Sequence, residues 1–174
     1  MIYFIRHGQS QANVERIIAS RDYPAPLTQK GREQAKIAGY DIKTKKLTID
    51  NIIASPLERA RDTALIIAAT IGFNASQIQL DERLIEYDMG SFTGMPIHGA
   101  LEHEIISAED TEDPQAFQDR VMACLTQMSS KPGNTLLVSH DYIGRIIGTA
   151  RLHMDPKNFY QLKEYPNAQL VELS

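Results

Sequence analysis

The segment Ile2-Tyr3-Phe4-Ile5-Arg6-His7-Gly8-Gln9-Ser10 joins an apolar run to a polar turn. Its first four residues are apolar and of types that favour strands, so they predict a short buried strand. An arginine, a histidine and a glycine follow at the carboxyl end of this strand, where open α/β sheets bind their ligands. A guanidinium fits phosphate oxygens, and a neutral imidazole is a good nucleophile near its ordinary pKa of about 6.5. The segment therefore predicts a histidine that attacks a phosphoryl group.

Buried strands followed by helices recur along the rest of the chain. Apolar runs predict further strands at 51–54, 77–80, 135–138, 159–162 and 170–173. Apolar periodicity and capping residues predict helices that begin at Thr28, at Ser55-Pro56, at Pro114 and near Tyr142. This alternation predicts a three-layer α/β/α sandwich with a mostly parallel central sheet, as one domain over residues 1–174. The remaining stretches, 8–27 and 81–94, are expected to be irregular, and 95–113 is expected to be a lid or a substrate loop.

Composition limits the functions that the chain can have. Its 174 residues are 43% hydrophobic and 23% charged, with a formal net charge of −4, which is typical of a globular enzyme domain. Lysines and arginines form no stripe, so nucleic acid is not expected as a partner. No apolar run approaches the ~20 residues that span a bilayer, so no membrane contact is expected. The first strand begins at once, without a basic stretch or a cleavage site, and we expect a cytoplasmic protein.

Side chains of types that can bind phosphate follow three of the predicted strands. Arg6 and His7 follow the first strand, Arg59 comes shortly after strand 51–54, and His140 follows strand 135–138. Because parallel strands end at the same edge of a sheet, these side chains are expected to meet in one crevice. A further segment, 83–90, brings carboxylates between two turn signals.

These motifs together resemble those of the histidine phosphatase superfamily, which is also called phosphoglycerate mutase-like. The resemblance extends over nearly the whole chain and keeps the family's order. The matching blocks are Arg6-His7-Gly8-Gln9-Ser10 with Asn13, Pro26-Leu27-Thr28 with Gly31, Ser55-Pro56-Leu57-Glu58-Arg59-Ala60 with Thr63-Ala64, Leu84-Ile85-Glu86 with Gly90 and Gly94, and Val138-Ser139-His140.

The resemblance implies a phosphomonoester hydrolase that needs neither a metal nor a cofactor and acts on a small phosphorylated metabolite. His7 would carry a phosphohistidine intermediate, and Glu86 would be the general acid and base. The other implied site residues hold the phosphoryl oxygens: Arg6, Arg59 and His140, with Asn13 assisting. Phosphoryl transfer spreads charge over the equatorial oxygens, which cationic side chains can stabilise.

The chain departs from the family pattern at a few positions. Asp141 stands where a small residue is usual, and we expect it to cap the following helix. Ser20 stands where a glycine is common and is expected to narrow the site or to contact the substrate. Arg145, one helical turn further along, is a candidate for the pocket mouth. Arg61 is expected to be a surface residue, and Glu82 is a less favoured alternative acid.

Other functions remain open on the sequence. One is a phosphoglycerate mutase, although the segment 95–113 is short and no lysine or arginine lies between Arg83 and Arg120 to hold a substrate carboxylate. Another is a phosphohistidine protein phosphatase, which the presence of Glu86 disfavours. A non-catalytic phosphate-binding module is a further possibility. The histidines His98 and His103, with nearby glutamates, are expected to be exposed rather than to hold a metal.

Overall fold

One sheet with strand order β3-β2-β4-β1-β5 forms the centre of the computed structural model, which describes residues 1–97 and 102–173. In this part of the chain the strands are β1 (Ile2–Arg6), β2 (Asn51–Ala54), β3 (Gln79–Leu80), β4 (Thr135–Ser139) and β5 (Leu170–Glu172). The first four run parallel, and β5 pairs antiparallel with β1 at the edge. The prediction of a mostly parallel sheet is confirmed.

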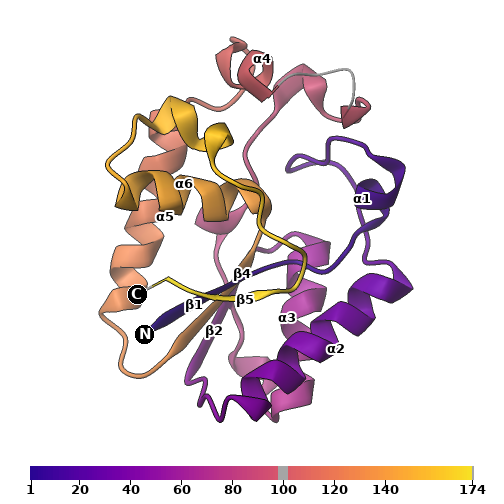
Figure 1. The fold of residues 1–174 in the computed structure, drawn as a ribbon, viewed down its shortest axis with the longest axis vertical. Helices are drawn as coiled ribbons and strands as arrows, with labels where there is room; N and C mark the ends of the chain where they lie inside the picture. The colour runs from indigo at the N-terminus through magenta and orange to yellow at the C-terminus, as the bar shows by residue number, and fades with distance from the viewer. Residues whose placement is uncertain (98–101, 174) are drawn as a thin grey trace.

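Helices cover both faces of this sheet (Figure 1). One face carries α2 (Gln29–Thr44) and α3 (Glu58–Ile71), and the other carries α5 (Pro114–Ser129) and α6 (Asp141–Arg151). Neighbouring residues of β1 point to opposite faces, as strand geometry requires: Phe4 packs with the core under α5 and α6, and Ile5 with the core under α2 and α3. The predicted three-layer α/β/α sandwich is therefore confirmed.

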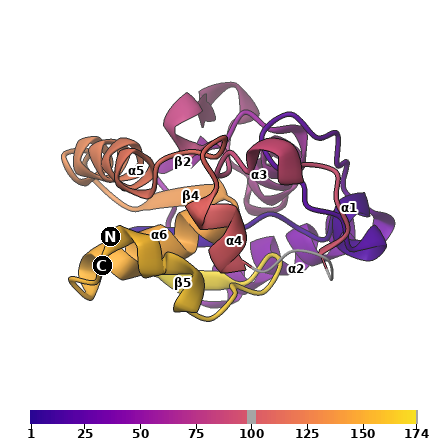
Figure 2. The same cartoon turned by 90° about the horizontal axis from the view of Figure 1, so that it is seen from above.

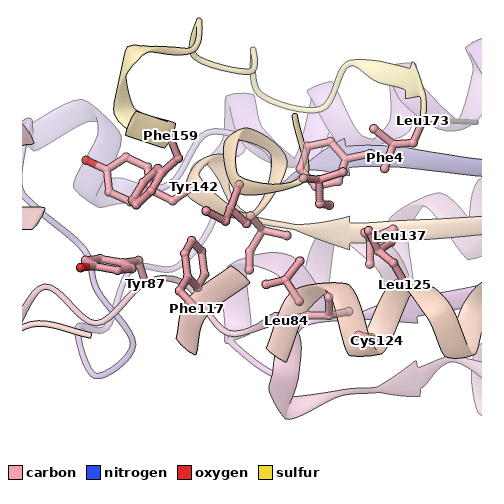
Figure 3. Close-up of a cluster of buried hydrophobic side chains, with 14 of the residues drawn as sticks. Phe4, Leu84, Tyr87, Phe117, Cys124, Leu125, Leu137, Tyr142, Phe159 and Leu173 are labelled. Atoms are coloured by element: carbon pink, nitrogen blue, oxygen red, sulfur yellow. The ribbon is translucent and has the colours of Figure 1, made fainter. Parts of the chain in front are cut away.

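An aromatic cluster connects the α5 and α6 layer to the segment that carries Glu86 (Figure 3). Tyr87 packs edge-to-face on Phe117, with ring centroids 5.1 Å apart, and lies 5.4 Å from Phe159. Phe159 in turn packs on Tyr142 of α6 at 4.9 Å. Edge-to-face rings at such distances add to the stabilisation that burial alone gives. The backbone next to Glu86 is thus fixed by packing.

The predicted strand at 159–162 is wrong. Residues Pro156–Gln161 form a 3₁₀ helix (η5), which the Asp155 side chain caps by accepting from the Lys157 amide. Proline in the first turn and an aspartate cap favour a helical start over a strand. The apolar residues that suggested a strand, above all Phe159, are buried from this helix instead.

Two short helices lie in segments that the sequence indicated to be irregular. Within 8–27, α1 (Gln11–Glu15) begins with a capping box in which Ser10 and Asn13 bind each other's backbone amides. Within 95–113, α4 (Glu102–Ser107) buries Ile105 and Ile106. Viewed from above, α4 lies between α6 and α1 (Figure 2).

The helix predicted from Thr28 begins as expected, with the Thr28 hydroxyl accepting from the Gly31 amide. It continues through Gly39 to Thr44. A Cβ at Gly39 would lie 2.6 Å from the Cβ of Thr70 in α3, so the glycine permits close packing of two helices rather than ending one. No helix in the part of the chain that is described is long and apolar enough to cross a membrane.

Candidate active site

The end of β1 delivers Arg6 and His7 into a loop held at several points. The His7 amide donates to the Ser139 carbonyl at 2.8 Å, and the Gly8 amide donates to the Thr63 hydroxyl at 3.0 Å. The α2 backbone at Gly31 packs directly on this loop, where a Cβ on Gly8 would lie 2.3 Å from the Gly31 carbonyl oxygen. The glycine after the histidine is therefore required for close backbone approach.

The hydrogen bond of His7 defines its tautomer. Its Nδ1 lies 2.7 Å from the Gly8 carbonyl oxygen. A carbonyl can only accept, so Nδ1 carries the hydrogen. In a neutral ring Nε2 then has the free lone pair. Burial, followed by the charges of Arg59 and Arg6, lowers the pKa of His7 well below its ordinary value. His7 is therefore neutral at physiological pH, with Nε2 available as a nucleophile.

His140 is fully buried next to His7, with ring centroids 5.3 Å apart. Its Nε2 lies 2.8 Å from the Ser55 hydroxyl, whereas its buried Nδ1 has no hydrogen-bond partner among the described residues. Burial, with the charges of Arg59, also lowers the pKa of His140. A buried polar atom without a partner is costly, so Nδ1 is a candidate donor or acceptor for a bound ligand.

Ser55 does not cap α3 as predicted. The helix begins after Leu57, which has no side-chain cap bond. The Ser55 hydroxyl instead accepts from the Leu57 amide at 3.3 Å and contacts His140. The hydroxyl can also donate to Nε2 of His140, and in that tautomer the ring hydrogen lies on Nδ1. In that tautomer His140 is a donor even when neutral.

Arg59 enters the site from the first turn of α3 and is 3% exposed. Its Nη2 donates to the carbonyls of Ala19 and Ser20 at 3.1 and 3.4 Å. Burial lowers the pKa of Arg59 to about 10, so the guanidinium stays charged at neutral pH. Its charge therefore remains available for an anion. Arg61, by contrast, pairs with Asp62 at 3.6 Å and has a side chain that is 45% exposed, as predicted.

Arg6 is anchored on one side and unsatisfied on the other. Its Nη1 donates to the Glu164 carboxylate and to the Tyr165 carbonyl, each at 2.7 Å. Its Nε is buried and has no hydrogen-bond partner among the described residues. The guanidinium is thus held in position while one of its donors is left for a ligand.

Glu86 is buried in the same pocket, and burial raises its pKa to about 7. The charge of Asp141 adds to this rise, while the amide of Tyr87, which donates to Oε1 at 3.1 Å, opposes it. A carboxyl that is partly protonated at neutral pH is suited to general acid catalysis. Glu82, the alternative acid, belongs to the 3₁₀ helix η2 (Glu82–Leu84) and is not among the residues that line the pocket.

The prediction that Asp141 caps α6 is wrong. The residue at the cap position is His140, without a side-chain cap bond. Asp141 is the first residue of the helix, and its Oδ1 accepts from the amide of Tyr165, 2.7 Å away and 24 residues later. Its Oδ2 pairs with Arg145 at 2.7 Å. The carboxylate therefore binds Tyr165 and Arg145 instead of capping the helix, and burial raises the pKa of Asp141.

Ser20, for which the sequence suggested a substrate contact, is buried and is not among the described residues that line the pocket. Its hydroxyl donates to the Tyr87 carbonyl and accepts from the Met89 amide, both at 3.0 Å. These bonds join the loop after α1 to the segment that holds Glu86. The structure thus gives Ser20 a positioning role. Asn13 does line the pocket, where its Oδ1 accepts from Ser10 and Asn167.

One cavity of about 630 Å³ lies at the carboxyl edge of the sheet and is lined by most of the candidate site residues. His140 and Ser55 are not among its lining residues, although the His140 ring packs against His7. Glu164 and Asn167, which no sequence motif indicates, line it too. The Asn167 side-chain amide donates to the His7 carbonyl at 2.9 Å. The lining residues include Arg6, His7, Asn13, Val14, Arg59, Glu86, Glu102, Asp141, Arg145, Glu164 and Asn167.

No pattern in the sequence points to Glu164 and Asn167, because they come from the loop before β5 and reach the site only through tertiary contacts. Of the histidines considered as metal ligands, His98 lies outside the described residues. Within residues 1–97 and 102–173, no group of three or more histidine, cysteine, aspartate or glutamate side chains could hold a metal ion.

The chain belongs to the histidine phosphatase superfamily: the model for its branch 1 matches residues 2–174. The chain is 35% identical over 163 residues to the probable phosphoglycerate mutase GpmB of Salmonella choleraesuis (strain SC-B67), an alignment that covers 85% of this chain and 73% of that protein. The corresponding protein of Citrobacter koseri is 36% identical with the same coverage.

Solved structures share the fold at lower identity. The putative alpha-ribazole-5'-P phosphatase from Escherichia coli str. K-12 matches with a TM-score of 0.79 and 24% identity, covering 97% of this chain and 87% of that one. The native mycobacterial glucosyl-3-phosphoglycerate phosphatase matches with a TM-score of 0.79 and 23% identity, again covering 97% and 87%. At these identities the likeness establishes the fold and not the substrate.

Proposed function

We propose that this protein is a phosphomonoester hydrolase that works through a phosphohistidine on His7, without a metal. The observation that carries the proposal is that two buried groups in one pocket, His7 and Glu86, have pKa values shifted in opposite directions. The pKa of His7 is lowered, which keeps the nucleophile neutral, and the pKa of Glu86 is raised to about 7, which keeps the acid partly protonated at neutral pH. Groups with such divergent pKa values are typical of acid–base catalysis.

In the first step, the lone pair on His7 Nε2 attacks the phosphorus atom. A nitrogen–phosphorus bond forms as the bond from phosphorus to the leaving oxygen breaks. That oxygen keeps the bonding electron pair and takes the proton of Glu86. An alkoxide is a poor leaving group, so this proton transfer matters most for alkyl phosphates.

In the second step, a water molecule attacks the phosphohistidine. Glu86, now a carboxylate, takes a proton from the water as the oxygen–phosphorus bond forms. The nitrogen–phosphorus bond breaks, and its electron pair returns to Nε2. Inorganic phosphate leaves, and both His7 and Glu86 are back in their starting protonation states.

The transferring phosphoryl group would be held by donors from different elements. Buried Nε of Arg6 and Nδ1 of His140 have no hydrogen-bond partner among the described residues, and Arg59 donates only to carbonyls. We assign these donors, with Asn13 assisting, to the phosphoryl oxygens. The charges of Arg6 and Arg59, together with the hydrogen bonds from His140 and Asn13, supply the electrostatic stabilisation that a loose transition state requires.

A phosphoglycerate mutase is the second candidate, because curated relatives at 35–36% identity carry that name. We favour hydrolysis over the mutase reaction because Arg145 is not free to bind a substrate carboxylate. This arginine lines the cavity, but it is already bound to Asp141 and Glu102 at 2.7 and 3.0 Å. A mutase must hold the carboxylate of its substrate while it reorients the intermediate, and Arg145 is committed elsewhere.

The proposal is tested by turnover of p-nitrophenyl phosphate in the presence of EDTA, with wild type compared to His7→Ala. We expect EDTA-resistant turnover that falls by at least about 10³-fold in the variant, since the covalent route is lost. His103→Ala, an exposed histidine of α4, serves as the matched control and should retain full activity. Equal activity of His7→Ala and wild type would contradict the mechanism. Phosphate transfer between phosphoglycerates faster than release to water would instead support the mutase.

A further inference from the structure

The side of the pocket next to α6 carries more negative than positive charge. Arg145 is paired with Asp141 and with Glu102 of α4. Arg6 is paired with Glu164 at 2.7 Å and with Asp141 at 3.6 Å. We call the three carboxylates Glu102, Asp141 and Glu164 the acidic wall. All three line the cavity.

The acidic wall compensates the arginines near it before any substrate binds. Its carboxylates outnumber the two arginines that they contact. Asp141 matters most, because its side chain is 9% exposed and touches both guanidiniums, whereas Glu102 and Glu164 are 40% and 63% exposed. Charge–charge effects are strongest where water is excluded. A second anion on the substrate would therefore meet repulsion on this side.

The pocket also offers apolar contacts to a leaving group. Val14 and Ile17 come from α1 and the residues after it, Ile97 comes from the segment before α4, and Ile105 comes from α4 itself. Arg16 lines the pocket too, but its side chain is exposed to solvent, where a charge contributes little. The pocket thus suits a partly apolar alcohol.

We propose that the acidic wall selects phosphomonoesters whose alcohol carries no second anionic group. Substrates with a carboxylate or another phosphate on the leaving group are rejected by Asp141 and Glu102. This inference rests on the proposed hydrolase function and names the substrate class of the same site. It gives Asp141, at the position where the family usually has a small residue, a role in specificity.

The test compares two aryl phosphates that differ in one charge: meta-carboxymethylphenyl phosphate and its carboxamide. The methylene group insulates the ring, so the two phenols leave equally well. For wild type we expect kcat/KM to be about tenfold higher for the carboxamide. A tenfold change corresponds to the repulsion between two unit charges a few ångströms apart in a partly solvated pocket. In Asp141→Asn the ratio should fall toward one. Glu102→Gln should lower it in the same direction by a smaller factor.

Glu104→Gln is the matched control, because it removes the same charge from α4 at an exposed position outside the cavity. It should leave the ratio unchanged. The readout is a ratio of kcat/KM values within each variant, so a general loss of activity in Asp141→Asn does not obscure it. If Asp141→Asn fails to fold, Glu102→Gln provides the test. A wild-type ratio near one, or a ratio that neither variant lowers, overturns the inference alone. No His7-dependent hydrolysis of either ester overturns the proposed function itself.

Discussion

At the scale of single residues, burial shifts the pKa values of the histidines and of Glu86 in opposite directions. Removing water disfavours the charged form of any group, so it lowers the pKa of His7 and raises that of Glu86. Arg6 and Arg59 lower the pKa of His7 further and partly offset the rise at Glu86. The same enclosure therefore prepares a neutral base and a protonated acid.

Glu86→Gln should separate substrates by the quality of their leaving group. For alkyl phosphates we expect kcat/KM to fall by about 10²-fold or more, the usual contribution of a general acid. For p-nitrophenyl phosphate the loss should stay below about tenfold, because that phenolate leaves without a proton. The measurement is kcat/KM for both ester types in wild type and variant. Equal losses on both would remove Glu86 from the role of acid.

The activity of wild type on alkyl phosphates should also decline as pH rises through about 7. The pKa of Glu86 is raised to about 7, so above this pH the proton needed by the leaving group is lost. The pH profile of kcat/KM measures this limb. An alkaline limb that persists unchanged in Glu86→Gln would have to come from another group.

The buried carboxyl should also cost stability at alkaline pH. A folded-state pKa raised above the unfolded value of 4.5 means that the stabilising contribution of Glu86 is complete below about pH 4.5 and is lost as pH rises through about 7. Glu86→Gln removes this loss. We expect the variant to be more stable than wild type by on the order of 2 kcal/mol at about pH 8, with the difference shrinking toward pH 5. Urea unfolding at both pH values measures it, and a difference independent of pH would contradict the assignment.

At the scale of elements, the site depends on a close contact between the loop after β1 and the start of α2. A Cβ added at Gly31 would lie 2.0 Å from the Gln9 carbonyl oxygen. Backbone cannot yield as a flexible side chain can, so Gly31→Ala must displace the loop that holds His7. We expect a loss of about 2 kcal/mol or more in the free energy of unfolding, as overpacked sites show, and a fall in kcat.

Lys30→Ala, at the exposed neighbouring position of α2, is the control and should match wild type in both measurements. Urea unfolding and turnover of p-nitrophenyl phosphate give the two readouts. A Gly31→Ala protein with wild-type stability and kcat would show that the loop does not depend on this contact.

The sequence predicts those elements whose signals are local. The strand 51–54, the Thr28 cap and the helix from Pro114 all match the structure, because apolar runs, a capping threonine and an N-terminal proline act within a few residues. The strand predicted at 159–162 fails because its apolar residues are buried from a 3₁₀ helix. Asp141 was expected to cap α6, but it bonds to the Tyr165 amide and Arg145.

The site residues likewise divide into those marked by local sequence motifs and those placed only by tertiary contacts. Arg6, His7 and Arg59, which follow predicted strands, line one cavity, and the buried His140 packs against His7. Asn13 and Glu86, which the family resemblance indicated, line the same cavity. Glu164 and Asn167 could not be predicted, because they approach through a loop that no short motif marks. The sequence suggests a substrate contact for Ser20, but its hydroxyl binds the backbone of Tyr87 and Met89, next to Glu86.

At the scale of the whole molecule, one core supports the acid and another supports the nucleophile. Tyr87, next to Glu86, belongs to the core under α5 and α6, whereas Ile5, two residues before His7, belongs to the core under α2 and α3. The sheet between them brings both groups to its carboxyl edge. The pocket is therefore sensitive to packing changes remote from it.

Phe117→Ala tests this dependence on the aromatic cluster. Phe117 is fully buried against Tyr87 and Phe159. Its loss should lower the free energy of unfolding by about 3–5 kcal/mol. Because the cluster fixes the backbone next to Glu86, alkyl phosphates should lose more activity than p-nitrophenyl phosphate. Tyr40→Ala, at an exposed aromatic of α2, should change neither quantity. Equal losses on the two ester types would show that the cluster does not position the acid.

The central claim is that a phosphoryl group is carried on Nε2 of His7 during turnover. Rapid acid-free quenching during hydrolysis of radiolabelled phosphate ester, followed by digestion at alkaline pH and mass spectrometry, tests it most directly. We expect a phosphoryl group that is stable to alkali, labile to acid and located on the peptide that contains His7. The label should be absent in His7→Ala and present in His103→Ala. A wild-type enzyme that turns over under these conditions with no label on His7, or with the label on another residue, would contradict the account.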